Sequence, residues 1–356
     1  MDKKIVIVAI AILIVAITLA FLIFKESSQL SPTELEECNS LSYSSDNAKN
    51  IVFFSTKQQA ESYSDYLLSQ KPFSEHKDAF NFYYIDDYFP ECEIYKGIAL
   101  LCYSKQLVKK ASSCPNDYLV VIQNQPSNIR SSCYMNTLSL NSKHNKNVFL
   151  HEFGHAFAFL ADEYTPAILP KKSKNCVKSC DEFTNPDKCY QGCSKAEYYR
   201  SIDSGIMKTL SSSNFGEFNN QIILNYFPAT SSITGQAISE TQDCTKEKYY
   251  LIEGKYENNK IKILDKQIEQ GCIGTSGQGD FEYTLTLQDN SKFEQEFNPE
   301  LIFTDDLEGG EVIISEENFF LKIPIIENAK SIEISQDQQP LIQINLQGIG
   351  ARPCKI

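Results

Sequence analysis

Residues 147–164 of the 356-residue chain read NVFLHEFGHAFAFLADEY. The apolar residues on either side of the two histidines predict a buried helix, and on a helix His151 and His155 project from the same face. Two imidazoles in this arrangement can bind one metal ion, while Glu152, about 100° round the helix, can reach a water on that metal. The stretch therefore predicts a zinc site with Glu152 as the catalytic general base of a hydrolase.

Such a zinc site needs a third protein ligand, and the shortage of histidine favours a carboxylate. Of the four histidines in the chain, only His76 and His144 remain outside the motif. Asp162 is the nearest carboxylate after the motif, and Glu163 follows it. On a straight helix Asp162 would lie about 10 Å along the axis from the second histidine, too far to share a metal. We therefore expect the helix to end near residues 158–160, without a glycine to ease the turn, and Asp162, Glu163 or His144 to complete the site.

The stretch HEFGHAFAFLADEY resembles the signature of the M64 metallopeptidases, the family named for an immunoglobulin A peptidase. In that signature HEFGH is followed by a short apolar stretch and then by LADEY. A weaker likeness covers about residues 75–227 and includes FNFY from Phe80, DYLVV from Asp117 and SGIM up to Met207. The chain differs from the family at Phe159, where the signature usually has glycine.

This resemblance implies a zinc-dependent endopeptidase with a metzincin-like catalytic domain. It implies that His151 and His155 are zinc ligands and that Glu152 is the catalytic base. By its position in the motif, Asp162 is implied as the third ligand. Met207 would lie beneath the metal in a Met-turn.

The sequence around the motif alternates apolar runs with a polar helical stretch. Three runs are almost uninterrupted, which is typical of strands covered on both faces: 51–54, 80–85 and 118–122. The polar stretch that follows the first run predicts a helix, capped by Ser55 or Thr56 and ending near Ser69. These patterns predict an α/β (α+β) zinc metallopeptidase domain over residues 49–240.

From about residue 244 the pattern changes to short apolar runs separated by Gly, Asn and Asp. Seven runs stand out: 249–252, 261–264, 283–287, 312–314, 319–326, 332–334 and 341–346. They predict an all-β sandwich-like domain over residues 241–356. Because this region contains no histidine, we expect it to have an accessory or spacer role.

The N-terminal region predicts a membrane anchor. Residues 5–24 contain no charge and are long enough, at about 1.5 Å per residue, to cross a bilayer. Lys3 and Lys4 precede the run, whereas Lys25 is followed at once by Glu26, so the N-terminus is expected in the cytoplasm. Residues 1–25 are therefore predicted to be a transmembrane signal anchor, and the polar residues 26–48 a stalk.

The twelve cysteines agree with a location of the remaining chain outside the cytoplasm, where disulfides persist. Cys176 and Cys180, and again Cys189 and Cys193, are four residues apart. Nested pairing of Cys176 with Cys193 and of Cys180 with Cys189 would staple a helical hairpin. A four-thiolate zinc site is the alternative, but such sites usually have two residues between paired cysteines and need reduced thiolates. We expect disulfides.

The predicted function is that of a single-pass, membrane-anchored, extracytoplasmic zinc metallopeptidase that needs Zn²⁺ and cleaves protein or peptide substrates. The formal net charge of −13 does not attract phosphate backbones, so no nucleic-acid partner is expected. Two alternatives are a surface binding or adhesion protein with an inactive metallopeptidase-like domain, and a zinc hydrolase that acts on cell-wall or glycan amides.

Overall fold

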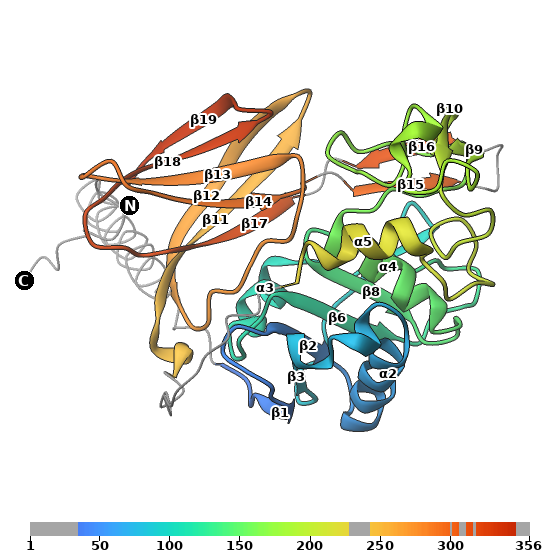
Figure 1. Cartoon of the computed structure of the whole chain (residues 1–356). Helices are drawn as coiled ribbons and strands as arrows, with labels where there is room; N and C mark the ends of the chain where they lie inside the picture. Colours follow the sequence, from blue (N-terminus) through green and yellow to red (C-terminus); the bar gives the residue numbers. More distant parts are fainter. Residues whose placement is uncertain (1–34, 228–242, 300, 306–310, 316–317, 347–356) are drawn as a thin grey trace, which may run out of the picture. The chain divides into compact units, whose positions relative to one another are not determined.

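A six-stranded mixed sheet organises the first half of the chain in the computed structural model, which describes residues 35–227, 243–299, 301–305, 311–315 and 318–346 (Figure 1). Its strand order is β1-β3-β2-β6-β8-β7. The four inner strands are parallel, and the two edge strands run antiparallel to their neighbours. The strands are β1 (Asn39–Ser42), β2 (Lys49–Phe54), β3 (Phe80–Ile85), β6 (Tyr118–Gln123), β7 (Ser132–Tyr134) and β8 (Thr137–Asn141).

Both faces of this sheet are buried. On β2, Ile51 and Phe53 belong to a hydrophobic cluster with residues of three helices, and Val52 and Phe54 belong to a second cluster with residues of a fourth. Successive side chains of a strand point to opposite faces, so burial of all four explains the uninterrupted apolar run. The three helices of the first cluster are α2 (Lys57–Ser69), α4 (Asn147–Ala158) and α5 (Glu217–Leu224), and α3 (Lys105–Ala111) packs in the second.

Local signals located several of these elements correctly. The three uninterrupted runs lie in β2, β3 and β6. Helix α2 begins after Thr56, whose hydroxyl accepts a hydrogen bond from the backbone N–H of Gln59, and it ends at Ser69 as predicted. Within the stretch expected to be a stalk, residues 39–42 form β1, and a disulfide joins Cys38 to Cys114.

Short elements connect the sheet and the helices. Two antiparallel pairs are formed by β4 (Glu93–Tyr95) with β5 (Ala99–Leu101), and by β9 (Tyr190–Cys193) with β10 (Lys195–Arg200). Single turns of 3₁₀-helix are η1 (Phe73–Glu75), η2 (Lys77–Ala79), η3 (Cys180–Glu182) and η4 (Cys244–Lys246).

The second half of the described chain consists of antiparallel strands. One sheet has the order β12-β11-β17 and another the order β14-β13-β18-β19, and their buried side chains share one hydrophobic cluster. A separate hairpin pairs β15 with β16. The strands are β11 (Lys248–Glu257), β12 (Lys260–Gln270), β13 (Phe281–Leu287), β14 (Lys292–Phe297), β15 (Leu301–Asp305), β16 (Glu311–Ser315), β17 (Asn318–Pro324), β18 (Ala329–Gln336) and β19 (Gln339–Asn345). Each of the seven predicted runs overlaps one of these strands, and only β14 and β15 contain none of the runs.

The two halves meet through buried polar contacts and belong to one compact unit, Leu35–Ile356. The hydroxyl of Tyr103 donates to the carbonyl oxygen of Phe320 at 3.1 Å and accepts from its N–H at 3.0 Å. The side-chain nitrogen of Lys322, a residue that is 5% exposed, donates to Asn116 Oδ1 at 2.6 Å. These bonds satisfy polar groups that would otherwise be costly to bury between the sheets.

The predicted fold class is wrong. We expected an α/β (α+β) metzincin-like domain with an all-β sandwich-like domain and a preceding transmembrane helix. The described residues form mixed sheets with few helices. No described helix is long and apolar enough to cross a membrane, and the predicted anchor at residues 1–25 lies outside the described residues. The error has a physical cause: an uninterrupted apolar run indicates burial on both faces of a strand, but not the direction of its neighbours.

Five disulfides link the described cysteines, which confirms the disulfide prediction: Cys38–Cys114, Cys92–Cys102, Cys176–Cys193, Cys180–Cys189 and Cys244–Cys272. The nested pairing is as predicted, but the enclosed segment contains η3 and β9 instead of a helical hairpin. Cys133 is a free thiol, and Cys354 lies outside the described residues.

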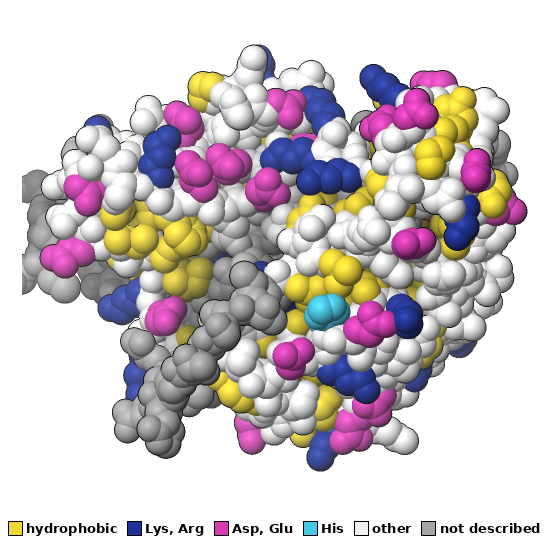
Figure 2. Space-filling model, in the orientation of Figure 1, with side chains coloured by type: hydrophobic (Ala, Val, Ile, Leu, Met, Phe, Trp, Pro, Cys, Tyr) yellow, Lys and Arg dark blue, Asp and Glu magenta, His cyan; other side chains and the backbone are white. Residues whose placement is uncertain are grey.

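On the face drawn in Figure 2, acidic and basic side chains are interspersed, and the exposed apolar side chains form small separate groups. Interspersed charge of this kind does not produce a field aimed at one ligand.

Candidate metal centre

Helix α4 carries the predicted site on one side and a hydrophobic anchor on the other. Phe149, Phe153 and Phe157 recur every fourth residue and are almost fully buried in the cluster beneath the sheet. The ring centroids of Phe153 and Phe157 are 5.3 Å apart. This packing fixes the helix about its axis, so that His151 and His155 face away from the aromatic side chains.

Helix α4 ends at Ala158, within the range 158–160 expected from the sequence. Phe159 follows the last helical residue in the left-handed conformation, with φ 50° and ψ 39°. Its N–H donates to the carbonyl oxygen of His155 at 3.1 Å, and the N–H of Leu160 donates to that of Gly154 at 3.3 Å. A left-handed residue at this position is a common helix end, but it usually is glycine, because a side chain adds strain of about 1–2 kcal/mol. The turn sends the chain back toward the histidines.

Three ligand atoms converge as a result. His151 Nε2 and His155 Nε2 are 3.1 Å apart, and Asp162 Oδ1 lies 3.2 Å from the first and 3.4 Å from the second. Tetrahedral coordination at 2.0–2.1 Å places ligand atoms about 3.3 Å from one another. The three atoms therefore have the spacing of one face of a zinc coordination tetrahedron.

The hydrogen bonds of the rings indicate that these atoms present lone pairs. His151 Nδ1 lies 3.0 Å from the carbonyl oxygen of Ile206, and His155 Nδ1 lies 2.6 Å from that of Leu160. Since a carbonyl only accepts, each Nδ1 carries the proton and each Nε2 is left as an acceptor in the neutral ring. Two lone pairs and a carboxylate oxygen repel one another unless a metal ion or a proton lies between them.

Asp162 is held in place, but its inner oxygen has no donor when both histidine rings are neutral. Its Oδ2 accepts a hydrogen bond from the hydroxyl of Tyr164 at 2.9 Å. With neutral rings, its Oδ1 is buried without a hydrogen-bond partner. A buried acceptor without a partner is costly in a protein interior, and a metal ion would satisfy it. The residues present therefore fit a divalent zinc-like ion.

Charges around the cluster change the acidity of its groups. Burial lowers the pKa of His155, but the carboxylates of Asp162 and Glu152 outweigh it and raise this pKa to about 9. Burial raises the pKa of Asp162, but the two histidine rings hold it well below its usual value. Without a metal, the neighbouring carboxylates therefore favour a protonated His155 ring at neutral pH.

Glu152 lies beside the cluster in a pocket of about 290 Å³. Burial raises the pKa of its carboxyl group above the usual value, although His151 and His155 oppose the shift. A carboxylate in such a site is a stronger base than one in water. Other residues that line the pocket include Arg130, His144, Lys208, Leu210 and Asn298. Asn298 follows β14, so the half expected to be an accessory domain contributes to the pocket wall.

The two alternative third ligands, His144 and Glu163, form hydrogen bonds with other groups than the histidine pair. His144 lies in the pocket, but its Nε2 is 3.0 Å from the carbonyl oxygen of Ser127 and its Nδ1 is 3.3 Å from the hydroxyl of Ser131. Glu163 is fully buried and accepts hydrogen bonds from the side-chain amides of Asn175 and Asn219 at 3.2 and 2.7 Å. Burial raises the pKa of this glutamate to about 7.

Met207, the residue implied for a Met-turn, is fully buried below α4. A Cβ atom added at Gly154 would meet Met207 Sδ at 2.9 Å, so the thioether lies against the helix between the two histidines. The carbonyl oxygen of Met207 accepts the N–H of Glu163 at 2.8 Å. This turn therefore links the helix to the segment that carries Asp162.

Several supporting groups were missed in the sequence. They are the carbonyl oxygens of Leu160 and Ile206, the hydroxyl of Tyr164, and Asn175. No local spacing marks a carbonyl acceptor, because every residue has one. Tyr164 belongs to the quoted motif, and its position two residues after Asp162 could have indicated that its hydroxyl binds this carboxylate.

No protein-family model matches the chain, and no curated protein is significantly similar to it in sequence.

Proposed function

We propose that this chain is a zinc-dependent metallopeptidase in which His151, His155 and Asp162 hold Zn²⁺ and Glu152 is the general base. The observation that supports this most strongly is the mutual spacing of 3.1, 3.2 and 3.4 Å among the three ligand atoms. The likeness of the motif to the immunoglobulin A peptidase-like family adds support from sequence.

Each residue has a defined part in the proposed reaction. Zn²⁺ held by His151, His155 and Asp162 would supply Lewis acidity, which lowers the pKa of a water at such a site from 15.7 to about 7 and polarises a carbonyl. Glu152 accepts the proton of the attacking water and then delivers it to the leaving amine. Its raised pKa suits both steps, because the carboxyl group must first accept the proton and then donate it. Tyr164 holds Asp162 in its ligand orientation.

We also propose that the enzyme works outside the cytosol. Five disulfides support this compartment, since they persist in oxidising surroundings. The apolar run at residues 5–24 and the lysines before it support attachment to the cell membrane with the N-terminus in the cytoplasm.

The test compares the purified chain with Glu152→Gln. The unchanged chain should contain one Zn²⁺ and cleave an unfolded protein substrate. Glu152→Gln should keep the zinc and lose cleavage at least a hundredfold, because only the proton acceptor is removed. Cleavage that survives this substitution would refute the assignment of Glu152, and a chain that binds no stoichiometric zinc would point to a binding protein instead.

A further inference from the structure

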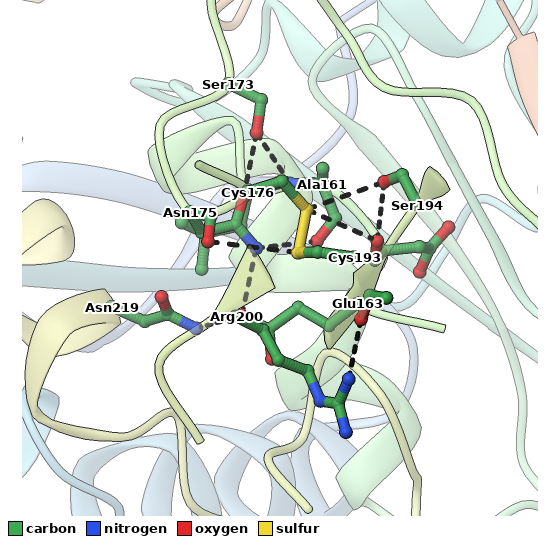
Figure 3. The surroundings of a disulfide bond; sticks show 12 residues. Ala161, Glu163, Ser173, Asn175, Cys176, Cys193, Ser194, Arg200 and Asn219 are labelled. Atoms are coloured by element: carbon green, nitrogen blue, oxygen red, sulfur yellow. Dashed lines mark hydrogen bonds between the residues drawn. A yellow bond between two sulfur atoms is a disulfide. The ribbon is translucent and has the colours of Figure 1, made fainter. Parts of the chain in front are cut away.

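The segment that carries Asp162 is held mainly by side chains from outside the helix (Figure 3). Asn175, which is fully buried, forms two bonds to the backbone of Ala161: its Oδ1 accepts the N–H at 2.7 Å, and its Nδ2 donates to the carbonyl oxygen at 2.9 Å. The same Nδ2 donates to Glu163 Oε1 at 3.2 Å. One amide thus holds the residues on both sides of the metal ligand.

A second buried side chain fixes the backbone of Asp162 itself. The hydroxyl of Ser194 donates to the carbonyl oxygen of Asp162 at 2.6 Å, and Ser194 is fully buried. Asn175 and Ser194 come from different stretches of chain, one before and one after the loop that contains η3. Neither stretch is part of the helix that carries the histidines.

The Cys176–Cys193 disulfide connects these two stretches. It joins the residue after Asn175 to the residue before Ser194 (Figure 3). Both sulfurs are buried and form a small cluster with Ala161. The disulfide therefore keeps the two donors at a constant separation on either side of the 161–163 segment.

We propose that Asn175, Ser194 and the Cys176–Cys193 disulfide are positioning elements for the third metal ligand, an inference that rests on the proposed function. The turn at Phe159 is conformationally strained for a residue with a side chain, so the return of Asp162 to the histidines must be held by other contacts. Groups outside the coordination shell commonly change metal affinity by 10–100-fold when removed. Loss of these positioning elements would free the segment that carries Asp162 without altering any of the three proposed ligands.

The chain offers a matched control for this proposal. The inner disulfide, Cys180–Cys189, closes the same loop. In the part of the chain that the structure describes, neither of its cysteines forms a hydrogen bond to residues 160–163. Its removal also deletes one covalent link from the same region, so any general effect of loosening the loop is common to both variants.

The experiment measures Zn²⁺ affinity of the purified full chain by competition with a chromophoric chelator, and the visible spectrum after Co²⁺ substitution. The variants are Asn175→Ala, Ser194→Ala, Cys176→Ser/Cys193→Ser and the control Cys180→Ser/Cys189→Ser, each checked for folding by circular dichroism. We expect a 10–100-fold loss of zinc affinity in Asn175→Ala, in Ser194→Ala and in the Cys176/Cys193 variant, with an altered Co²⁺ spectrum. The control should remain within about threefold of the unchanged chain.

A purely structural role would lower the melting temperature but leave zinc affinity of the folded protein unchanged. The proposal is overturned if the folded variants among Asn175→Ala, Ser194→Ala and the Cys176/Cys193 pair all bind Zn²⁺ as tightly as the control. Ser194→Ala removes a single hydroxyl, so it decides the question if the other variants do not fold. Failure of the unchanged chain to bind Zn²⁺ is a separate result, which overturns the proposed function itself.

Discussion

Asp162 Oδ1 lies 3.4 Å from His155 Nε2, although the end of helix α4 lies between the two residues. This contact completes the candidate metal centre and also determines its acid–base behaviour. In the metal-free chain, burial lowers the pKa of His155, but the anionic carboxylate next to the imidazole raises it to about 9, so the ring carries a proton at neutral pH.

Zinc must displace this proton, so zinc affinity should depend on pH. With the pKa of His155 near 9, the ring is protonated at neutral pH and must become neutral to bind the metal. We expect the apparent affinity to fall about tenfold for each pH unit from 8 to 6. Competition titrations at three pH values measure this slope. The same affinity at pH 6 and pH 8 would show that the His155 ring carries no proton at neutral pH.

The hydroxyl of Tyr164 should contribute to metal affinity through Asp162. Tyr164→Phe removes the donor to Asp162 Oδ2 but keeps the ring, so we expect zinc to bind about tenfold more weakly. Tyr198, which packs near the Cys176–Cys193 disulfide, offers the matched substitution Tyr198→Phe. Equal zinc affinities for the two variants would mean that the Tyr164 hydroxyl has no role in holding the ligand.

Gly154 should not tolerate a larger residue. Alanine usually stabilises a helix relative to glycine, but here its Cβ would lie 2.9 Å from both Met207 Sδ and Phe215 Cε1. We expect Gly154→Ala to lower the free energy of unfolding by about 1–3 kcal/mol, measured by chemical denaturation. In a double-mutant cycle with Met207→Ala, the combined loss should be smaller than the sum of the single losses. Additive losses would show that Met207 is not the group that restricts this position.

Lys322 should make stability depend on pH in the alkaline range. Burial lowers its pKa from 10.5 to about 7 in the folded chain. Between these values the unfolded chain binds a proton that the folded chain does not, so stability rises as the pH rises from about 7 to 10. The slope from this one group is about 1.4 kcal/mol per pH unit.

The measurement compares denaturation of the unchanged chain, Lys322→Met and the exposed control Lys260→Met at several pH values. We expect the alkaline rise in the unchanged chain and in the control, and a flatter profile in Lys322→Met. A profile of Lys322→Met parallel to that of the control would show that Lys322 is charged in the folded protein.

The parts of the site that follow from local geometry were predictable. His151 and His155 share a face because they are four residues apart in a helix, whatever the rest of the chain does. The nested pairing of Cys176 with Cys193 followed from their spacing, because the inner pair then closes a short loop of its own. Strand positions such as those of β2 and β6 followed from their uninterrupted apolar runs.

The fold class was not predictable from the same signals. The apolar runs did not show that β1 and β7 pair antiparallel at the sheet edges, because burial of a strand does not depend on the direction of its neighbours. Nor did any pattern show that Lys322 and Asn116 would meet between the two halves of the chain.

The sequence by itself therefore determined the helix with its two histidines and glutamate, and it indicated the nested disulfides Cys176–Cys193 and Cys180–Cys189. Only the tertiary structure decided that Asp162 returns to the histidines, since Phe159 has no intrinsic preference for the left-handed conformation that it adopts. Contacts distant in sequence hold that conformation: Asn175 and Ser194 bind the returning segment, and a disulfide fixes their separation. A helix pattern depends on neighbours within one turn, whereas a ligand beyond the end of a helix depends on everything that packs against the turn.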